Sequence, residues 1–313
     1  MSDLKVYSSP HIHSGDSVKN IMWTVVFSLL PVFIASIYFF GLPAFTITAA
    51  CIISCVATES FITSRYGTAG NVKDGSAVLT GLLLAFCLPP TVPLWIPVLG
   101  GVFAMGVVKH AFGGLGVNVF NPALMGRAFL LASWPVLMTT WRKPFDAVTS
   151  ATPLAVEKMQ GMQTLMESMG GQSQMYKDLL IGNIGGCLGE TSALLLAIGG
   201  LYLLWKGVIT WHTPTAYFAT VIVLSFLMGE DVLFHLLAGG LMIGAFYMAT
   251  DYVTTPITGK GKLVFGLGCG LITMAIRVYG GLPEGVSYSI LIMNAFTPLI
   301  DRHTMRTPKG WSK

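Results

Sequence analysis

Long apolar runs separated by short polar connections dominate the chain. A helix needs roughly 20 mostly apolar residues to cross a bilayer. By that measure about ten segments predict membrane-spanning helices, namely 21–41, 44–63, 75–90, 93–112, 119–138, 190–209, 213–229, 232–250, 262–279 and 285–300. The segment 75–90 is the weakest because it is short and ends in Pro89-Pro90. The pattern therefore predicts an all-α integral membrane protein with about ten transmembrane helices.

Composition supports a membrane protein. Of the 313 residues, 53% are hydrophobic and only 10% are charged, whereas a soluble domain carries about 25% charged residues. The net charge is +4, and the basic residues are spread over loops, which argues against a nucleic-acid partner. Residues 1–20 are polar and are predicted to be an N-terminal segment that is not a cleaved signal peptide.

The five cysteines indicate neither a disulfide framework nor a metal centre. Four of them lie in apolar runs, and none forms a Cys-x-x-Cys pair. Cys51 and Cys55 would share a helix face, which allows metal ligation, but small buried thiols are ordinary core residues. We therefore predict no metal site.

The distribution of basic residues predicts the orientation. An even number of spans places both termini on one side, and the positive-inside rule identifies it as the cytoplasmic side. The predicted cytoplasmic segments hold Lys5, Lys19, Arg65, Lys73, Lys109, Lys206, Lys260, Lys262, Arg302, Arg306, Lys309 and Lys313. The other side holds Arg142, Lys143, Lys158, Lys177 and Arg277. The loop 139–189 is then extracytoplasmic, and residues 301–313 form a cytoplasmic tail.

An internal repeat divides the predicted helices into two halves, 21–138 and 190–300. Gly113-Gly114-Leu115 precedes Ala128-Phe129 at the spacing that separates Gly280-Gly281-Leu282 from Ala295-Phe296. Five spans per half would give the halves opposite topology, and inverted repeats frame a central site near the bilayer midplane. The alternative is chance similarity between glycine-rich membrane segments.

The long loop contains the stretch Asp146-Ala-Val-Thr-Ser-Ala-Thr152-Pro153. A hydroxyl residue followed by proline is typical of a helix start, and Leu154–Met169 predicts a helix that Gly170-Gly171 ends. The positive end of a helix dipole favours a phosphate, so a phosphate ester on Thr152 would be well placed. The alternative is a capped helix start without a cofactor.

Two carboxylates are candidates for an ion pathway. Glu59 lies deep in an apolar run, where an ionisable group is costly and indicates function by default. The alternative is a carboxylate that reaches the cytoplasmic interface or pairs with Arg65. Asp251, after the span 232–250, either caps the next segment or lines an ion entrance, whereas Glu284 is expected to be a solvated turn residue or a helix-start carboxylate.

A further candidate site lies in the stretch from Gly113 to Arg127. The amides of Asn118 and Asn121 could hydrogen-bond a polar ligand, and Gly113 and Gly114 would allow close approach. Without a cofactor, the amides would instead cap the helix that begins at Pro122.

Together these stretches resemble a known family. The resemblance covers nearly the whole chain and is carried by Ser9–His13 with Ser17, Leu88–Trp95, Asn121–Phe129, Asp146–Leu154, Ala249–Asp251, Pro283–Gly285 and Asn294–Phe296. The chain is similar to the D subunit of the Rnf complex, a membrane-bound ferredoxin:NAD oxidoreductase, and to the B subunit of the sodium-translocating NADH:quinone oxidoreductase.

The resemblance implies ten helices in a fold similar to urea transporters, in a bacterial cytoplasmic membrane. It implies FMN attached by a flavin transferase to Thr152, within an acceptor motif formed by Asp146, Thr149, Ser150 and Ala151. It also implies a non-covalent riboflavin near Asn118 and Asn121, with Gly113, Gly114 and Arg127 as further candidates. Many acceptor motifs have glycine where this chain has Ser150; both residues are small.

The implied function is an electron relay coupled to Na⁺ or H⁺ translocation, within a complex that supplies the other subunits. Glu59 and Asp251 match carboxylates linked to sodium uptake. Negative charge on a reduced flavin is costly in an apolar bundle unless a cation compensates it, which would couple electron flow to ion movement. The competing hypotheses are a solute channel of the urea-transporter type and a scaffold for other redox subunits.

Overall fold

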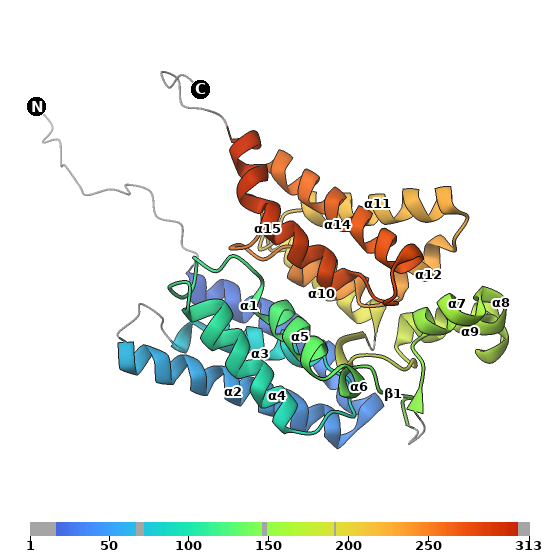
Figure 1. Cartoon of the computed structure of the whole chain (residues 1–313), viewed down its shortest axis with the longest axis horizontal. Helices are drawn as coiled ribbons and strands as arrows, with labels where there is room; N and C mark the ends of the chain where they lie inside the picture. The colour runs from blue at the N-terminus through green and yellow to red at the C-terminus, as the bar shows by residue number, and fades with distance from the viewer. Residues whose placement is uncertain (1–16, 67–71, 146–148, 191, 306–313) are drawn as a thin grey trace, which may run out of the picture.

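A computed structural model describes residues 17–66, 72–145, 149–190 and 192–305. Asp146 and the stretch Ser9–His13 lie outside the described residues. Figure 1 shows two groups of helices, α1 to α5 and α10 to α15, with the short helices α7 to α9 beside the second group. The described residues are predominantly helical, as the sequence predicted.

The first group packs around the two long helices at its start. Its elements are α1 (Val18–Phe40), α2 (Leu42–Tyr66), η1 (Val72–Asp74), α3 (Ser76–Phe86), α4 (Trp95–Phe103), η2 (Ala104–His110), α5 (Pro122–Ser133) and α6 (Pro135–Met138). Helix α2 packs against α3 and α4, and η2 continues α4 as a π-helix. The close approach of α3 to α2 needs Gly81, where a Cβ would lie 2.7 Å from the backbone of Ile52.

The second group packs around α11 and α14. Its elements are η3 (Leu188–Glu190), α10 (Ala193–Trp205), α11 (His212–Met228), α12 (Val232–Leu237), α13 (Leu241–Ile243), η4 (Gly244–Met248), α14 (Gly259–Tyr279) and α15 (Val286–Thr304). Helix α14 packs along α11 and against α15, and η4 is a second π-helical stretch. The two groups meet where α1 packs on α10 and α5 packs on α15.

A β-ribbon and three short helices connect the groups. Strands β1 (Trp141–Arg142) and β2 (Thr149–Ser150) are antiparallel. They precede α7 (Pro153–Gln160), α8 (Met162–Ser168) and α9 (Gln172–Ile181). The predicted single helix Leu154–Met169 was wrong, because Gly161 ends α7 with a φ of +86°. Helices α7 to α9 share a small apolar core with α12 that includes Leu154, Leu165, Met175, Leu179 and Phe234.

The helical groups are suited to a lipid environment. Three helices are long and apolar enough to cross a membrane, Val18–Phe40, Leu42–Arg65 and Gly259–Tyr279, and four shorter helices are also apolar. Large apolar side chains cover the outside, including Phe61, which is 68% exposed, and Phe226, which is 76% exposed. Apolar surface of this extent needs lipid or protein to cover it.

The ten predicted segments each contain a helix, but not all are continuous. Helix α3 has 11 residues and ends before Pro89-Pro90; at 1.5 Å per residue it is about 16 Å long, roughly half the thickness of a bilayer core. The segment 232–250 is interrupted after Leu237 and resumes at Leu241. The number of complete crossings therefore stays a prediction.

Candidate functional site

Thr152 begins α7 as the sequence predicted. Its extended backbone, with φ −68° and ψ 153°, precedes Pro153 in the first helical position. Its Oγ1 accepts a hydrogen bond from the Ala155 N–H at 3.3 Å, which satisfies one of the free donors of the first turn. The residue is only 3% exposed. The capped helix start is confirmed.

A cavity of about 610 Å³ lies next to this helix start, and we call it the loop cavity. The β-ribbon holds Thr149 and Ser150 beside Trp141. Its lining residues come from both helical groups and from the connecting segment, and include Arg127, Leu131, Trp141, Thr149, Ser150, Ala151, Ala155, Glu284, Ser287 and Tyr288. Ser150 Oγ is buried without a hydrogen-bond partner and faces Gly185. The acceptor motif therefore borders a space large enough for an aromatic ligand.

An ion pair joins the two helical groups within the loop cavity. Arg127, on α5, forms a salt bridge with Glu284 and donates to Ser287 Oγ at 3.1 Å. The side chains of Arg127 and Glu284 are 12% and 13% exposed, so Glu284 is not a solvated turn residue. It directly precedes Gly285, the N-cap of α15, which agrees with the alternative of a helix-start carboxylate. Glu284 Oε1 is buried without a hydrogen-bond partner. The pair can present charge and hydrogen-bonding groups to a ligand.

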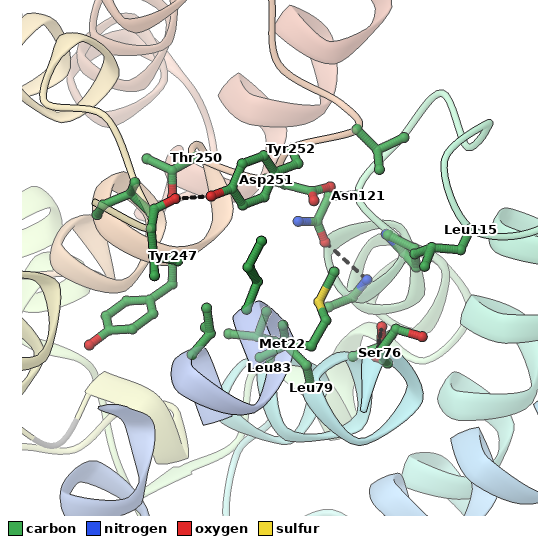
Figure 2. A pocket seen from close by; sticks show the side chains of 18 of the residues that line it. Met22, Ser76, Leu79, Leu83, Leu115, Asn121, Tyr247, Thr250, Asp251 and Tyr252 are labelled. Atoms are coloured by element: carbon green, nitrogen blue, oxygen red, sulfur yellow. Dashed lines mark hydrogen bonds between the residues drawn. The ribbon is translucent and has the colours of Figure 1, made fainter. Parts of the chain in front are cut away.

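A second cavity, of about 80 Å³, lies at the opposite end of α5, and we call it the amide cavity. Its lining residues include Met22, Ser76, Leu79, Leu83, Lys109, Leu115, Asn118, Asn121, Tyr247 and Asp251. Figure 2 shows Asn121 and Asp251 on one side, with Met22, Leu79 and Leu83 below them.

Asn121 caps α5, as predicted for the chain without a cofactor. Its Oδ1 accepts from the N–H groups of Ala123 and Leu124 at 3.1 and 3.3 Å. Asn118 Nδ2 donates to the carbonyl oxygen of Phe120 at 3.1 Å, and both asparagines are buried. The amides therefore have local structural roles within the cavity wall.

Glu59 is fully buried, and its partner is not Arg65. Lys109 Nζ lies 2.5 Å from Glu59 Oε1 and donates to Ser76 Oγ at 2.7 Å. His110 Nε2 is 3.7 Å from Glu59 Oε1, and Glu59 Oε2 is buried without a hydrogen-bond partner. Because Lys109 and Ser76 line the amide cavity, they connect it to this carboxylate.

The structure divides the predicted site residues between the two cavities. Asn118, Asn121 and Asp251 line the amide cavity, whereas Arg127 lies in the loop cavity, apart from the asparagines with which it was grouped. Gly113 and Gly114 form the turn after η2, with φ of +116° and +102°. Neither is among the residues that line the amide cavity.

Two buried basic residues were assigned wrongly to loops by the charge count. Lys109 is 2% exposed within η2, and Arg277 is 4% exposed within α14. The available signal was the position of Lys109 inside the apolar run 93–112, opposite the equally isolated Glu59.

Lys158 fastens α7 to the second helical group. Its Nζ donates to the carbonyl oxygens of Ile276 at 3.2 Å, Arg277 at 2.8 Å and Leu282 at 3.3 Å, and also to that of Gly280. Three of these carbonyls lie at the C-terminal end of α14, where a cation interacts favourably with the helix dipole, and that of Leu282 lies in the following turn. Burial lowers the pKa of Lys158, and the neighbouring Glu157 opposes that shift. One side chain therefore ties the helix that follows Thr152 to the edge of the loop cavity.

Replacing Lys158 by methionine is expected to loosen this attachment, because the ammonium group that bonds to four carbonyl oxygens is lost while the apolar stem is kept. Limited proteolysis should then cut the connecting segment several-fold faster. Lys177→Met, at an exposed position of α9, is the control and should leave the cleavage rate unchanged. Equal cleavage of both variants would show that Lys158 does not hold α7 in place.

Comparison with known proteins places the chain in a family. Residues 5–310 match the model of the NQR2, RnfD, RnfE family. The chain is 50% identical to the D subunit of the Na⁺-translocating ferredoxin:NAD⁺ oxidoreductase complex of Acetobacterium woodii, over 99% of this chain and 96% of the relative.

Two further relatives have related names. The D subunit of the proton-translocating ferredoxin:NAD⁺ oxidoreductase complex of Clostridium ljungdahlii is 48% identical, over 97% of this chain and 96% of the relative. The D subunit of the ion-translocating oxidoreductase complex of Stutzerimonas stutzeri is 39% identical, over 91% and 90% respectively. By the extent of these matches, the chain belongs to the NQR2, RnfD, RnfE family.

Proposed function

We propose that this chain is a membrane subunit of an ion-translocating ferredoxin:NAD⁺ oxidoreductase complex, and that it relays electrons through flavins. The supporting observation is the position of Thr152, which starts a helix beside the loop cavity in a chain of this family. The other subunits of the complex are its partners, and the complex as a whole is the enzyme. The transported ion is Na⁺ or H⁺.

FMN attached through its phosphate to Thr152 Oγ1 suits the loop cavity. The cavity volume of about 610 Å³ lies within the range of ligand pockets, roughly 300–1,000 Å³. Among the lining residues, Arg127 offers a cation, and Ser287 and Tyr288 offer hydroxyl groups. Bound flavin would supply one-electron redox chemistry. The chain would orient the ring and provide compensating charge.

The Thr152 hydroxyl can lose its proton without losing its structural role. Oγ1 accepts the hydrogen bond from Ala155 and therefore needs only a lone pair to cap α7. A phosphate at this position would also lie at the positive end of the helix dipole. A flavin transferase would need access to the hydroxyl, which is 3% exposed, so attachment requires α7 or the β-ribbon to open.

Riboflavin in the amide cavity is the second part of the proposal. Because Oδ1 of Asn121 caps α5, its Nδ2 is the donor that could face a ligand. A volume of about 80 Å³ is too small for a tricyclic ring, so flexible side chains such as Met22 would have to move. Asp251 and the Glu59–Lys109 pair lie beside the same space and are the proposed ion-pathway groups.

The packing of α5 against α15 supports the proposed inverted repeat of five and five helices. Arg127 directly precedes Ala128, and Asn294 directly precedes Ala295, so the two occupy equivalent positions in the repeat. Arg127 bonds to Ser287 near the start of α15. When the Asn294 amide is oriented so that its oxygen and nitrogen both have hydrogen-bond partners, its oxygen accepts from the backbone N–H of Asn121 at 3.1 Å. Asn121 is the N-cap of α5. Thus Arg127 on α5 contacts the start of α15, and Asn294 on α15 contacts the start of α5.

Denaturing-gel fluorescence tests the proposal. The complex, produced together with its flavin transferase, should give a fluorescent band for this chain that Thr152→Ala removes. Thr164→Ala is the matched control, because it deletes a hydroxyl of the same connecting segment at an exposed position of α8, outside the acceptor motif. The intact wild-type chain should also exceed its polypeptide mass by one FMN less one water. An unmodified wild-type chain would refute the covalent flavin and favour a solute channel.

A further inference from the structure

Three side chains that can ligate a metal converge outside both cavities. Glu157 lies on α7, Glu230 in the turn after α11, and His235 on α12. Their ligand atoms all lie within 4.8 Å of one another. His235 Nε2 is 4.0 Å from Glu230 Oε2, which is beyond hydrogen-bond distance. The three residues come from the connecting segment and from the second helical group.

His235 is the residue that indicates a ligand. It is 2% exposed, and neither of its ring nitrogens has a hydrogen-bond partner. Burying an imidazole in this way costs free energy, since the lost hydrogen bonds to water are not replaced. A cation held between the ring and the two carboxylates would satisfy one of these nitrogens.

The charged groups around the cluster form hydrogen bonds with groups other than its three side chains. Arg277 donates to the carbonyl oxygens of His235 at 2.6 Å and Ala238 at 2.8 Å. Lys158 bonds to the end of α14. Asp231 caps α12 and accepts from Tyr176.

The two glutamates therefore face each other without a cation bonded directly to either, among the described residues. Burial raises the pKa of Glu157, and Glu230 raises it further, while Lys158 and Arg277 act in the opposite direction. Two carboxylates that repel each other next to an unpartnered imidazole form a site with affinity for a divalent cation.

We propose that Glu157, Glu230 and His235 bind Zn²⁺, with water as the fourth ligand. An imidazole with two carboxylates suits zinc, whereas Mg²⁺ and Ca²⁺ prefer oxygen ligands alone. Zinc bonds of about 2.0–2.2 Å require the three side chains to close by roughly 1 Å. The ion would join α7 to α12 and so fix the segment that follows Thr152.

Zinc analysis of the purified complex tests this site. After chelation and dialysis against Zn²⁺, the wild-type complex should hold one more zinc ion than complexes with Glu157→Gln or His235→Asn. The affinity should fall by at least about 100-fold, since even outer-shell changes cost 10–100-fold. His212→Asn is the control, because it also removes a histidine with a buried, unpartnered nitrogen.

Replacing zinc by Co²⁺ gives a second measurement. The wild-type complex should show the intense visible bands of four-coordinate cobalt, and Glu157→Gln should abolish them. Should His235→Asn fail to assemble, Glu157→Gln and Glu230→Gln decide the question, because both residues are partly exposed. Equal zinc content and identical cobalt spectra in wild type and variants would overturn the proposal. Neither measurement depends on a bound flavin.

Discussion

Lys109→Met is expected to destabilise the protein by about 3–5 kcal/mol, which is the usual cost of removing one partner of a buried ion pair. Glu59 is fully buried, and Lys109 is the nearest cation to its carboxylate among the described residues. Without that ammonium group, the carboxylate stays charged in an apolar bundle or takes up a proton. Equilibrium unfolding in mixed micelles measures the loss.

The double variant Glu59→Gln with Lys109→Met separates the cost of an unpaired charge from the value of the pair. It should recover most of the lost stability, because neither position then carries a charge. Lys206→Met, an exposed lysine near the rings of Tyr202 and Trp205, is the control and should cost less than about 1 kcal/mol. A Lys109→Met protein as stable as the control would contradict the importance of the pair.

The same variants test the proposed ion role of Glu59. A purely structural carboxylate predicts that the double variant regains both stability and ion-dependent electron transfer. A residue of the ion pathway predicts that stability returns while ion dependence stays lost. Measuring NAD⁺ reduction by ferredoxin against Na⁺ concentration and pH, in the complex, distinguishes these outcomes.

Arg127→Met is expected to cost about 2–5 kcal/mol, the range found when one partner of a hydrogen-bonded charge pair is truncated. The guanidinium joins α5 to Glu284 and Ser287, so its loss weakens the contact between the two helical groups. It also leaves the carboxylate of Glu284 with two unsatisfied oxygens beside the loop cavity. Unfolding in mixed micelles and the fluorescence of the isolated complex measure the effect.

Arg127→Lys tests the geometry of this contact. Lysine keeps the charge but loses the planar fork that reaches Glu284 and Ser287 together. We expect an intermediate stability. Arg65→Met, at an exposed position near the end of α2, is the control and should change stability by less than about 0.5 kcal/mol. An Arg127→Met protein with the stability of this control would show that the contact adds nothing.

Local signals in the sequence predicted much of the fold. Apolar run length located the helices, and the hydroxyl-proline pair located the start of α7. Asn121 was correctly predicted as a cap, since the residue precedes Pro122 and the first apolar turn. These features depend on neighbouring residues, and for that reason one sequence is sufficient to recognise them.

Features that depend on distant residues were predicted poorly. Nothing near Glu59 in the chain indicates that Lys109, 50 positions away, is its partner. Glu284 resembles a solvated turn residue until α5 brings Arg127 beside it. Gly161 sits in a helix-favouring sequence, yet its positive φ breaks the run, and α8 packs against α7. Partners across a fold require tertiary structure.

The π-helical stretch η2 gives Lys109 a backbone that can change register. A π turn accommodates an extra residue, because its hydrogen bonds span five positions instead of four. If the position of the extra residue moved along the helix, each side chain in the affected stretch would rotate around the helix axis by about 100°. Lys109 lies in this stretch. It could therefore swing away from Glu59 while the backbone stays paired, as a hydrocarbon interior demands.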